Sequence, residues 1–224
     1  MWVITGTNGS IGGHLTSFYL SKNLEVLAVS ASPDDVKKNI SKSGISYDER
    51  NLHTYYDDYS KDLNDDKMKN ILGQKKISCL VISSGEYFSG SFLSTSYEDY
   101  ISNFRANFES CVRYISQLNQ FMDNNSNIIV INSIASKVPK KTEGSYAISK
   151  KTISTFIDSI ADELKDRNIH ITDLVCGAVK SNITKDRDNF DKLIDPSDLA
   201  QQILDITKLE ETLAIRRIEV LRSK

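Results

Sequence analysis

The sequence predicts an α/β fold, a doubly wound parallel β-sheet with helices on both faces. Short, continuously apolar runs such as ISCLVI (77–82) alternate along the chain with longer segments of helical periodicity. Continuous apolar runs are typical of strands that are buried on both faces. A glycine-rich turn also joins the first apolar run to the first helical segment. Strands alternating with helices in this way form parallel sheets with both faces covered.

Length and composition favour one domain over residues 1–224. A chain of 224 residues with 39% hydrophobic residues fills one core, and its net charge of −2 argues against a nucleic-acid or membrane surface. The cysteines Cys79, Cys111 and Cys176 lack metal-ligand spacing, so we expect buried thiols and no metal site. A strand beginning almost at Met1 leaves no room for a leader segment. We therefore expect a cytoplasmic protein.

The first strand, Trp2–Thr5, leads directly into the turn TGTNGSIGG and a helix. Strand, glycine-rich turn and helix is the context of a dinucleotide-binding fingerprint, because free amides at the helix start receive a pyrophosphate. This indicates a Rossmann-type fold, although a glycine cluster can also serve only as a turn. The cofactor-binding candidates here are Gly6, Asn8, Gly9, Ser10, Ile11 and Gly12.

The second strand, Leu24–Val29, is followed by Ser30, where an acidic residue would select NAD by binding the adenosine ribose. A small hydroxyl at Ser30 removes the repulsion against a 2′-phosphate, so the sequence slightly favours NADP(H) over NAD(H). No arginine follows to bind that phosphate, and Lys37 or Lys38 is the nearest candidate cation.

The middle of the chain adds further ligand-binding candidates. Asp58 lies in the polar segment after the predicted strand Leu52–Tyr56, and either caps the next turn or contacts the adenine amino group. Ser84 and Gly85 follow the strand Ile77–Ile82, and Gly85 either lets the backbone pass close to a ligand or only makes the turn.

The second half begins with a long predicted helix, Tyr97–Met122, in which Asn107 lies on the apolar face. Asn107 is either a satisfied core amide or holds a water beneath the active site. The strand Asn127–Asn132 then delivers Ser133 to its carboxyl end, where α/β sheets bind ligands. The remaining elements are a helix over Ala147–Leu164, a strand over Ile169–Cys176, a lid or substrate loop at about 182–194, a helix over Pro196–Thr207 and a strand over Leu213–Leu221.

Tyr146 and Lys150 stack on one face if SYAISK opens a helix. A phenol normally keeps its proton until about pH 10, but a nearby ammonium favours the phenolate. Lys150 would thus lower the pKa of Tyr146 and make it a proton donor or acceptor, while Ser133 bonds the same substrate oxygen. Alternatively, Tyr146 and Lys150 are only a surface pair, because a tyrosine four residues before a lysine is common on exposed helix faces.

The order of these motifs resembles the short-chain dehydrogenase/reductase family, compact single-domain type, over essentially the whole chain. Ser133, Tyr146 and Lys150 match its catalytic triad, and Asn107 falls where its fourth catalytic residue lies. The resemblance implies that Lys150 also binds the nicotinamide ribose and that Asn107 holds a proton-relaying water. Gly177, Val179 and Ser181 resemble the segment that receives the nicotinamide carboxamide.

The expected function is an NAD(P)(H)-dependent oxidoreductase that interconverts a carbonyl and a secondary alcohol by hydride transfer, with a small-molecule substrate. A non-catalytic dinucleotide-binding sensor is one alternative. A nucleotide-sugar epimerase or dehydratase is another, because the glycines Gly6, Gly9 and Gly12 give the spacing TGxxGxxG. The basic loop Lys137–Lys141 suggests a mild preference for anionic substrates, or is only a solvated loop. The family commonly forms dimers or tetramers, and we expect a homodimer or homotetramer.

Three replacements depart from the family pattern. Compact members usually carry TGxxxGxG, and Ser10 stands in place of its middle glycine. The strand Ile77–Ile82 is followed by Ser83-Ser84-Gly85 where the family has Asn-Ala-Gly, which places its sheet-stabilising hydrogen bonds in doubt. Cys176 stands where the family has proline before Gly177. None of these replacements removes a catalytic group.

Overall fold

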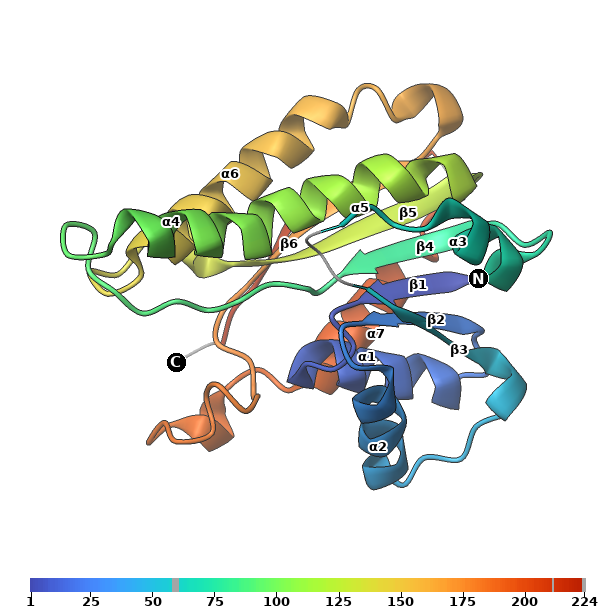
Figure 1. Ribbon diagram of the computed structural model, residues 1–224, viewed down its shortest axis with the longest axis horizontal. Helices are drawn as coiled ribbons and strands as arrows, with labels where there is room; N and C mark the ends of the chain where they lie inside the picture. The colour runs from blue at the N-terminus through green and yellow to red at the C-terminus, as the bar shows by residue number, and fades with distance from the viewer. Residues whose placement is uncertain (58–60, 211, 223–224) are drawn as a thin grey trace.

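A computed structural model of the protein describes residues 1–57, 61–210 and 212–222 and has a seven-stranded sheet at its centre (Figure 1). The strand order is β3-β2-β1-β4-β5-β6-β7, and all neighbouring strands are parallel. The strands are β1 (Trp2–Thr5), β2 (Val26–Ser30), β3 (Leu52–Tyr56), β4 (Ile77–Ile82), β5 (Met122–Ser133), β6 (His170–Cys176) and β7 (Arg217–Val220). The chain order reverses between β1 and β4, which is where doubly wound folds bind ligands.

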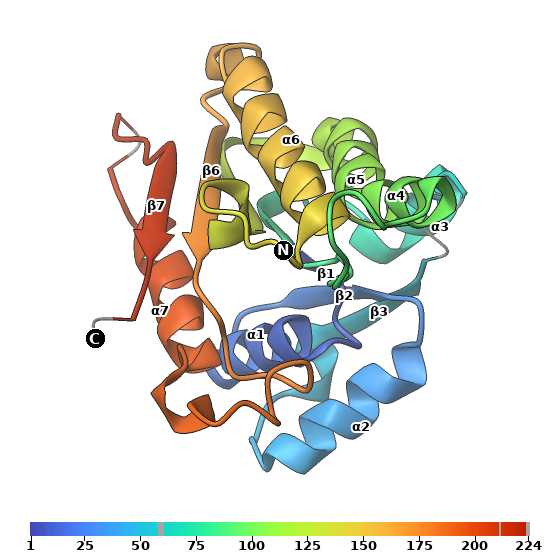
Figure 2. The same cartoon turned by 90° about the vertical axis from the view of Figure 1, so that its left-hand side faces the viewer.

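Helices cover both faces of the sheet, as Figure 2 shows most clearly. The helices α4, α5 and α6 lie on one side, and α1, α2 and α7 lie on the other. Their bounds are α1 (Ser10–Ser21), α2 (Pro33–Ser43), α3 (Asp65–Leu72), α4 (Tyr97–Phe104), α5 (Ser110–Leu118), α6 (Gly144–Ile160) and α7 (Pro196–Ile206). The predicted fold class, an α/β doubly wound parallel sheet of Rossmann type, is therefore confirmed.

Strand β4 shows why the central strands are continuously apolar. Its side chains alternate between two cores: Leu80 and Ile82 belong to the core under α5 and α6, and Cys79 and Val81 belong to the core under α1 and α7. From Cys79 to Ile82 the strand is buried on both faces, so this part of it does not tolerate unpaired polar side chains.

The predicted helix over Tyr97–Met122 differs from the structure in two ways. It is divided into α4 and α5 by a π turn over Arg105–Glu109, and it ends in a short 3-10 turn at Phe121, because Met122 already begins β5. A π turn inserts one extra residue into the helix and changes the direction of the side chains around it. Asn107 lies inside this turn and is fully buried.

Several predicted boundaries also move. Strand β5 begins earlier than predicted, α6 is shifted toward its N-terminus, and β7 is shorter than the predicted Leu213–Leu221. Helix α3 was not predicted, because its sequence DDKMKNIL buries only Met68 and Leu72. The predicted lid at about 182–194 consists of turns and a 3-10 segment, Phe190–Lys192, and its end is fixed by a bridge between Val179 and Ile194. Asp58 lies outside the described residues.

Candidate active site

Two adjoining cavities lie at the carboxyl ends of the central strands. We name them the Tyr146 cavity and the Ser30 cavity, after one residue that lines each. Ser83, Gly85 and Glu86 line both, so the two cavities form one continuous groove across the β1–β4 switch point. A groove in this place, long enough for two subsites, suits a dinucleotide together with a small substrate.

Most of the predicted site residues line this groove. The Tyr146 cavity brings together the four predicted catalytic residues and several cofactor candidates: Asn107, Ser133, Tyr146 and Lys150, with Ile11, Gly85, Gly177, Val179 and Ser181. The Ser30 cavity is lined by the candidates Gly6, Asn8, Gly9, Ser30, Ser84 and Gly85.

Among the predicted cofactor residues that the structure describes, Ser10 and Gly12 line neither cavity. The hydroxyl oxygen of Ser10 instead accepts a hydrogen bond from the Asn182 amide at 3.1 Å, which ties the start of α1 to the loop after β6. Gly12 packs against the turn itself, where an added Cβ would lie 2.5 Å from the carbonyl oxygen of Gly6. We therefore assign Ser10 and Gly12 roles in shaping the turn and its neighbouring loop.

Gly6 and Gly85 occupy positions that only glycine fits. Gly6 has φ +68°, and a Cβ there would lie 2.8 Å from the Ser84 backbone. Gly85 has φ +151°, and its Cβ would lie 2.5 Å from Asn107 Oδ1. Both glycines thus allow backbone segments to approach closely beneath the groove.

The serines after β4 make the contacts that the family pattern had placed in doubt. Ser83 Oγ donates a hydrogen bond of 2.6 Å to the Thr5 carbonyl oxygen, and Thr5 Oγ1 donates to Ser84 Oγ at 3.0 Å. The ends of β1 and β4 are therefore joined by hydroxyl groups in this chain.

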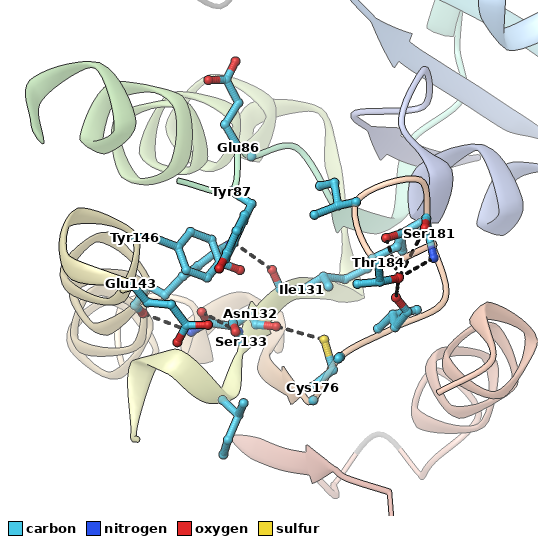
Figure 3. Close-up of a pocket in the computed structure, with 18 of the residues that line it drawn as sticks. Glu86, Tyr87, Ile131, Asn132, Ser133, Glu143, Tyr146, Cys176, Ser181 and Thr184 are labelled. Atoms are coloured by element: carbon cyan, nitrogen blue, oxygen red, sulfur yellow. Dashed lines mark hydrogen bonds between the residues drawn. The ribbon is translucent and has the colours of Figure 1, made fainter. Parts of the chain in front are cut away.

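Ser133 and Tyr146 meet in the Tyr146 cavity (Figure 3). Ser133 ends β5, whereas Tyr146 lies in the first turn of α6, and the Ser133 hydroxyl is close enough to the phenol to influence its pKa. Tyr87, from the loop after β4, packs against the Tyr146 ring edge-to-face with the centroids 5.1 Å apart. The phenol is thus held between a hydroxyl group and a second aromatic ring.

The pKa of Tyr146 is raised to about 12, because burial of the side chain penalises the phenolate. The Ser133 hydroxyl acts in the opposite direction, but it is the smaller effect. The sequence had led us to expect a lowered pKa, and the structure shows the reverse direction. In this state of the protein, Tyr146 is a protonated acid across the neutral range.

Lys150 lies one turn further along α6 and is buried. Its Nζ is 5.7 Å from the centroid of the Tyr146 ring and donates to the Ile131 carbonyl oxygen at 3.4 Å. Burial lowers the pKa of Lys150, while the nearby Cys111, Cys176 and Asp173 act to raise it.

Asn107 presents an unsatisfied acceptor to this cavity. Its Nδ2 donates to the carbonyl oxygens of Glu86 at 2.9 Å and Asn103 at 3.0 Å. Its Oδ1 is buried and has no hydrogen-bond donor among the residues that the structure describes. A buried acceptor without a partner is costly, so Asn107 Oδ1 marks a place where a ligand or ordered water would bond.

The loop after β4 is attached to the start of α6. Gly90 forms a bridge with Glu143: the Gly90 amide donates to the Thr142 carbonyl at 2.9 Å, and the Gly144 amide donates to the Gly90 carbonyl at 3.0 Å. Tyr87 lies in the same loop, so the bridge also fixes the position of the Tyr87 ring relative to Tyr146.

Sequence reasoning missed several groove residues. Asp57 lines the Ser30 cavity directly after β3, and it is bound by Arg113 at 3.0 and 2.5 Å and by the Tyr114 hydroxyl. Its place at a strand end was a signal that could have found it. Glu143, buried beside Tyr146, and Tyr87 gave no comparable signal (Figure 3).

The basic loop before Tyr146 is largely paired with acids. Lys137 forms an ion pair with Glu219, and Lys140 Nζ lies 3.7 Å from Glu143 Oε1. These partners leave less positive charge for an anionic substrate, and the preference for such substrates stays a prediction from the sequence.

The described residues contain neither a metal-binding cluster nor a membrane-spanning helix. Within residues 1–57, 61–210 and 212–222, no group of three or more His, Cys, Asp or Glu side chains is arranged to hold a metal ion. No helix in these same ranges has the length and apolar character needed to cross a bilayer.

Comparison with known proteins identifies the family. The family model described as short chain dehydrogenase matches residues 1–192. The chain is therefore a member of the short-chain dehydrogenase/reductase family, and an oxidoreductase. No curated protein sequence matches the chain.

Solved structures with the same fold share little sequence with this chain. A short-chain dehydrogenase/reductase from Brucella melitensis, described as a glucose/ribitol dehydrogenase, superposes with a TM-score of 0.86 at 18% identity, covering 98% of this chain and 94% of that one. A β-ketoacyl-[ACP] reductase (FabG) from Bacteroides thetaiotaomicron gives a TM-score of 0.81 at 19% identity, covering 99% and 95%. Serine dehydrogenase from Escherichia coli superposes with a TM-score of 0.79 at 18% identity, covering 97% of this chain and 95% of that one.

The raised pKa of Tyr146 gives a direct prediction for the free protein. Since burial favours the neutral phenol, the Tyr146 resonance in a ¹³Cζ-tyrosine NMR titration should keep its phenol shift through pH 10, where an ordinary tyrosine is about half ionised. The resonance is assigned by its loss in Tyr146→Phe. A midpoint at or below pH 10 would contradict the burial argument.

Proposed function

We propose that the protein interconverts a carbonyl and a secondary alcohol on a small molecule, using a nicotinamide dinucleotide, with Tyr146 as proton donor and acceptor. The observation that carries this proposal is the meeting of Ser133, Tyr146, Lys150 and Asn107 in one cavity, from two helical segments and a strand end. A single groove joins this cavity to a glycine-lined second subsite.

The groove residues fit such a cofactor. Helix α1 begins after the N-cap Gly9 with no acidic residue in its first turn, so its terminal amides suit a pyrophosphate. The Ser30 cavity would hold the adenosine end. Gly177, Val179 and Ser181 would hold the nicotinamide end, and Lys150 would bind its ribose. The unsatisfied Oδ1 of Asn107 supports a bonded water or ligand near Lys150.

The protein's own groups account for the proton chemistry. A bound nicotinamide supplies or accepts the hydride. Tyr146, which is protonated near neutrality, donates its proton to the carbonyl oxygen as negative charge develops there. Ser133 bonds the same oxygen and orients it. In the reverse direction the phenolate removes the proton of the alcohol, and the ammonium of Lys150 favours that phenolate.

The structure adds two opposing arguments on cofactor choice. Ser30 carries no negative charge that would repel a 2′-phosphate, and this favours NADP(H). Its hydroxyl oxygen accepts from the Ser32 amide at 2.9 Å. However, Lys38 lies 3.7 Å from Asp35, so it is partly neutralised and Lys37 is the better candidate for a 2′-phosphate. We propose NADP(H) as the preferred cofactor.

Assembly into a homodimer or homotetramer is proposed on an aromatic surface formed by the end of α4, the π turn after it and α6. Phe104, Phe108 and Phe156 are only partly buried and stack in sequence, with centroids 4.9 and 5.9 Å apart. An aromatic row shared by two adjacent helices suits burial against the same row of a second copy.

Removing the phenolic hydroxyl tests the catalytic proposal. Tyr146→Phe should lower kcat about 10²- to 10⁴-fold on any carbonyl substrate that the wild type reduces, because it removes the general acid. Cofactor affinity, measured by nicotinamide fluorescence, should change little. Tyr97→Phe, at an exposed tyrosine, is the matched control and should retain full activity. Retained turnover in Tyr146→Phe would refute the role of Tyr146.

Cofactor choice is tested by titrating the protein with NADPH and with NADH. We expect tighter binding of NADPH, and Lys37→Ala should weaken NADPH binding while leaving NADH unchanged. Tighter NADH binding would overturn the Ser30 argument but not the oxidoreductase function. Cofactor binding without turnover on a broad carbonyl panel would favour the sensor alternative, and tight sugar-nucleotide binding would favour the epimerase.

Oligomeric state is measured by light scattering at micromolar concentration. We expect a dimer or tetramer, and Phe108→Glu together with Phe156→Glu should shift it toward the monomer, because charge on this surface opposes its burial. Arg105→Glu, at an exposed position on the same helical segment, is the control. A wild-type monomer would contradict the proposed assembly.

A further inference from the structure

A buried polar network runs from the wall of the Tyr146 cavity, which Asn132 lines, to the last strand of the sheet (Figure 3). It joins Asn132 on β5, Ser154 on α6, Asp173 on β6 and Arg217 on β7. Asn132 is 2% exposed and Asp173 is 0% exposed. No local pattern in the sequence predicts this network, since its members are far apart in the chain.

Asn132 contacts the backbone of both Ser133 and Lys150. Its Oδ1 accepts from the Ser133 amide at 2.9 Å, and its Nδ2 donates to the Lys150 carbonyl oxygen at 3.2 Å. The same Nδ2 donates to Asp173 Oδ1 at 2.9 Å and to Ser154 Oγ at 3.0 Å. One side-chain amide therefore links the strand end that carries Ser133 to the helical turn that carries Lys150.

Asp173 holds that amide in place. Besides Asn132, its carboxylate accepts from Ser154 Oγ at 2.7 Å and from Arg217 Nε at 2.9 Å. A carboxylate in the middle of a covered sheet is very costly unless it is paired and hydrogen-bonded, and all three donors are needed to satisfy it.

The cation comes from the last strand. Arg217 is in register with Asp173 across the β6–β7 pair, and its Nη2 donates to Asp158 of α6 at 2.9 Å.

The charged and titratable groups around Lys150 come from four elements. They are Cys111 from α5, Cys176 and Asp173 from β6, Tyr146 from α6 itself, and Arg217 of β7 behind Asp173.

We propose that Asn132 and Asp173 are positioning residues that fix the offset between Ser133 and Lys150, and that Arg217 balances the charge of Asp173 behind Lys150. Asn132 supplies the geometry, because it bonds both backbones. Asp173 and Arg217 supply a paired negative and positive charge on the buried side of the lysine. The kinetic part of this inference rests on the proposed function, and the electrostatic part does not.

The geometric part is tested by Asn132→Ala. Because small displacements of catalytic groups cost up to about 10²-fold in rate, kcat should fall about 10- to 100-fold while KM for the carbonyl substrate and Kd for NADPH stay within about twofold. Asp158→Asn, which removes only the outer, half-exposed partner of Arg217, is the control and should keep wild-type kcat. Unchanged kcat in Asn132→Ala would overturn the positioning role.

The electrostatic part is tested without activity, by following the pKa of Lys150 with ¹³C-lysine NMR. Asp173→Asn leaves Arg217 unbalanced and should lower this pKa, whereas Arg217→Gln leaves Asp173 unbalanced and should raise it. Opposite shifts support the inference, because a general loosening of the fold would not give opposite signs. Shifts of the same sign, or none, would overturn it.

The two readouts separate this inference from the proposed function. If the wild type turned over no carbonyl or alcohol, the proposed function would fail, and the Lys150 titrations alone would decide the inference. If Asp173→Asn did not fold, the pKa of Lys150 would be compared between Arg217→Gln and Asp158→Asn. A higher pKa in Arg217→Gln would still support the inference, and an equal or lower one would overturn it. Arg217 is partly exposed at the sheet edge, so we expect that variant to fold.

Discussion

The burial of the parallel sheet on both faces is the constraint on which the rest of the structure depends. Side chains of the central strands enter one core or the other, so polar groups are largely excluded from the strand interiors. They collect where strands end: Ser83 to Gly85 after β4, Ser133 at the end of β5, and Gly177 after β6. The polar groups of the groove therefore come largely from strand ends and the loops after them.

Asp173 is a charged exception to this rule, and it explains the importance of β7. A carboxylate inside the sheet requires a cation, and Arg217 on the edge strand provides it. The family model matches residues 1–192, whereas β7 comes after this region. The last strand therefore satisfies a buried charge that the matched part of the chain leaves without its cation.

The sequence predicted the features that depend on local spacing. The helical period places Tyr146 and Lys150 on one face, and the glycine turn follows from its position between a strand and a helix. The π turn around Asn107 was not predictable, because it depends on packing rather than on a local pattern. The predicted direction of the pKa shift of Tyr146 was also wrong, since the sequence shows the neighbouring lysine but not how deeply the phenol is buried.

Features formed by residues distant in the chain were missed for the same reason. Asp57 is paired with Arg113, and Asp173 with Arg217, across separations that carry no periodic signal. Helix α3 was missed because a short polar segment with two buried residues does not differ from a loop in pattern. Strand ends, by contrast, are good places to look for functional residues in any α/β sequence.

The bridge between Gly90 and Glu143 has a consequence for how this enzyme can diversify. It anchors the loop after β4 midway along its length, so Tyr87 stays in register with α6 whatever happens beyond Gly90. Beyond Gly90 the backbone is still held at Phe92, whose carbonyl oxygen accepts from the Tyr100 hydroxyl at 2.8 Å, but the side chain of Leu93 is fully exposed. Substitutions at this exposed tip can therefore accumulate without moving Tyr87 or the catalytic helix.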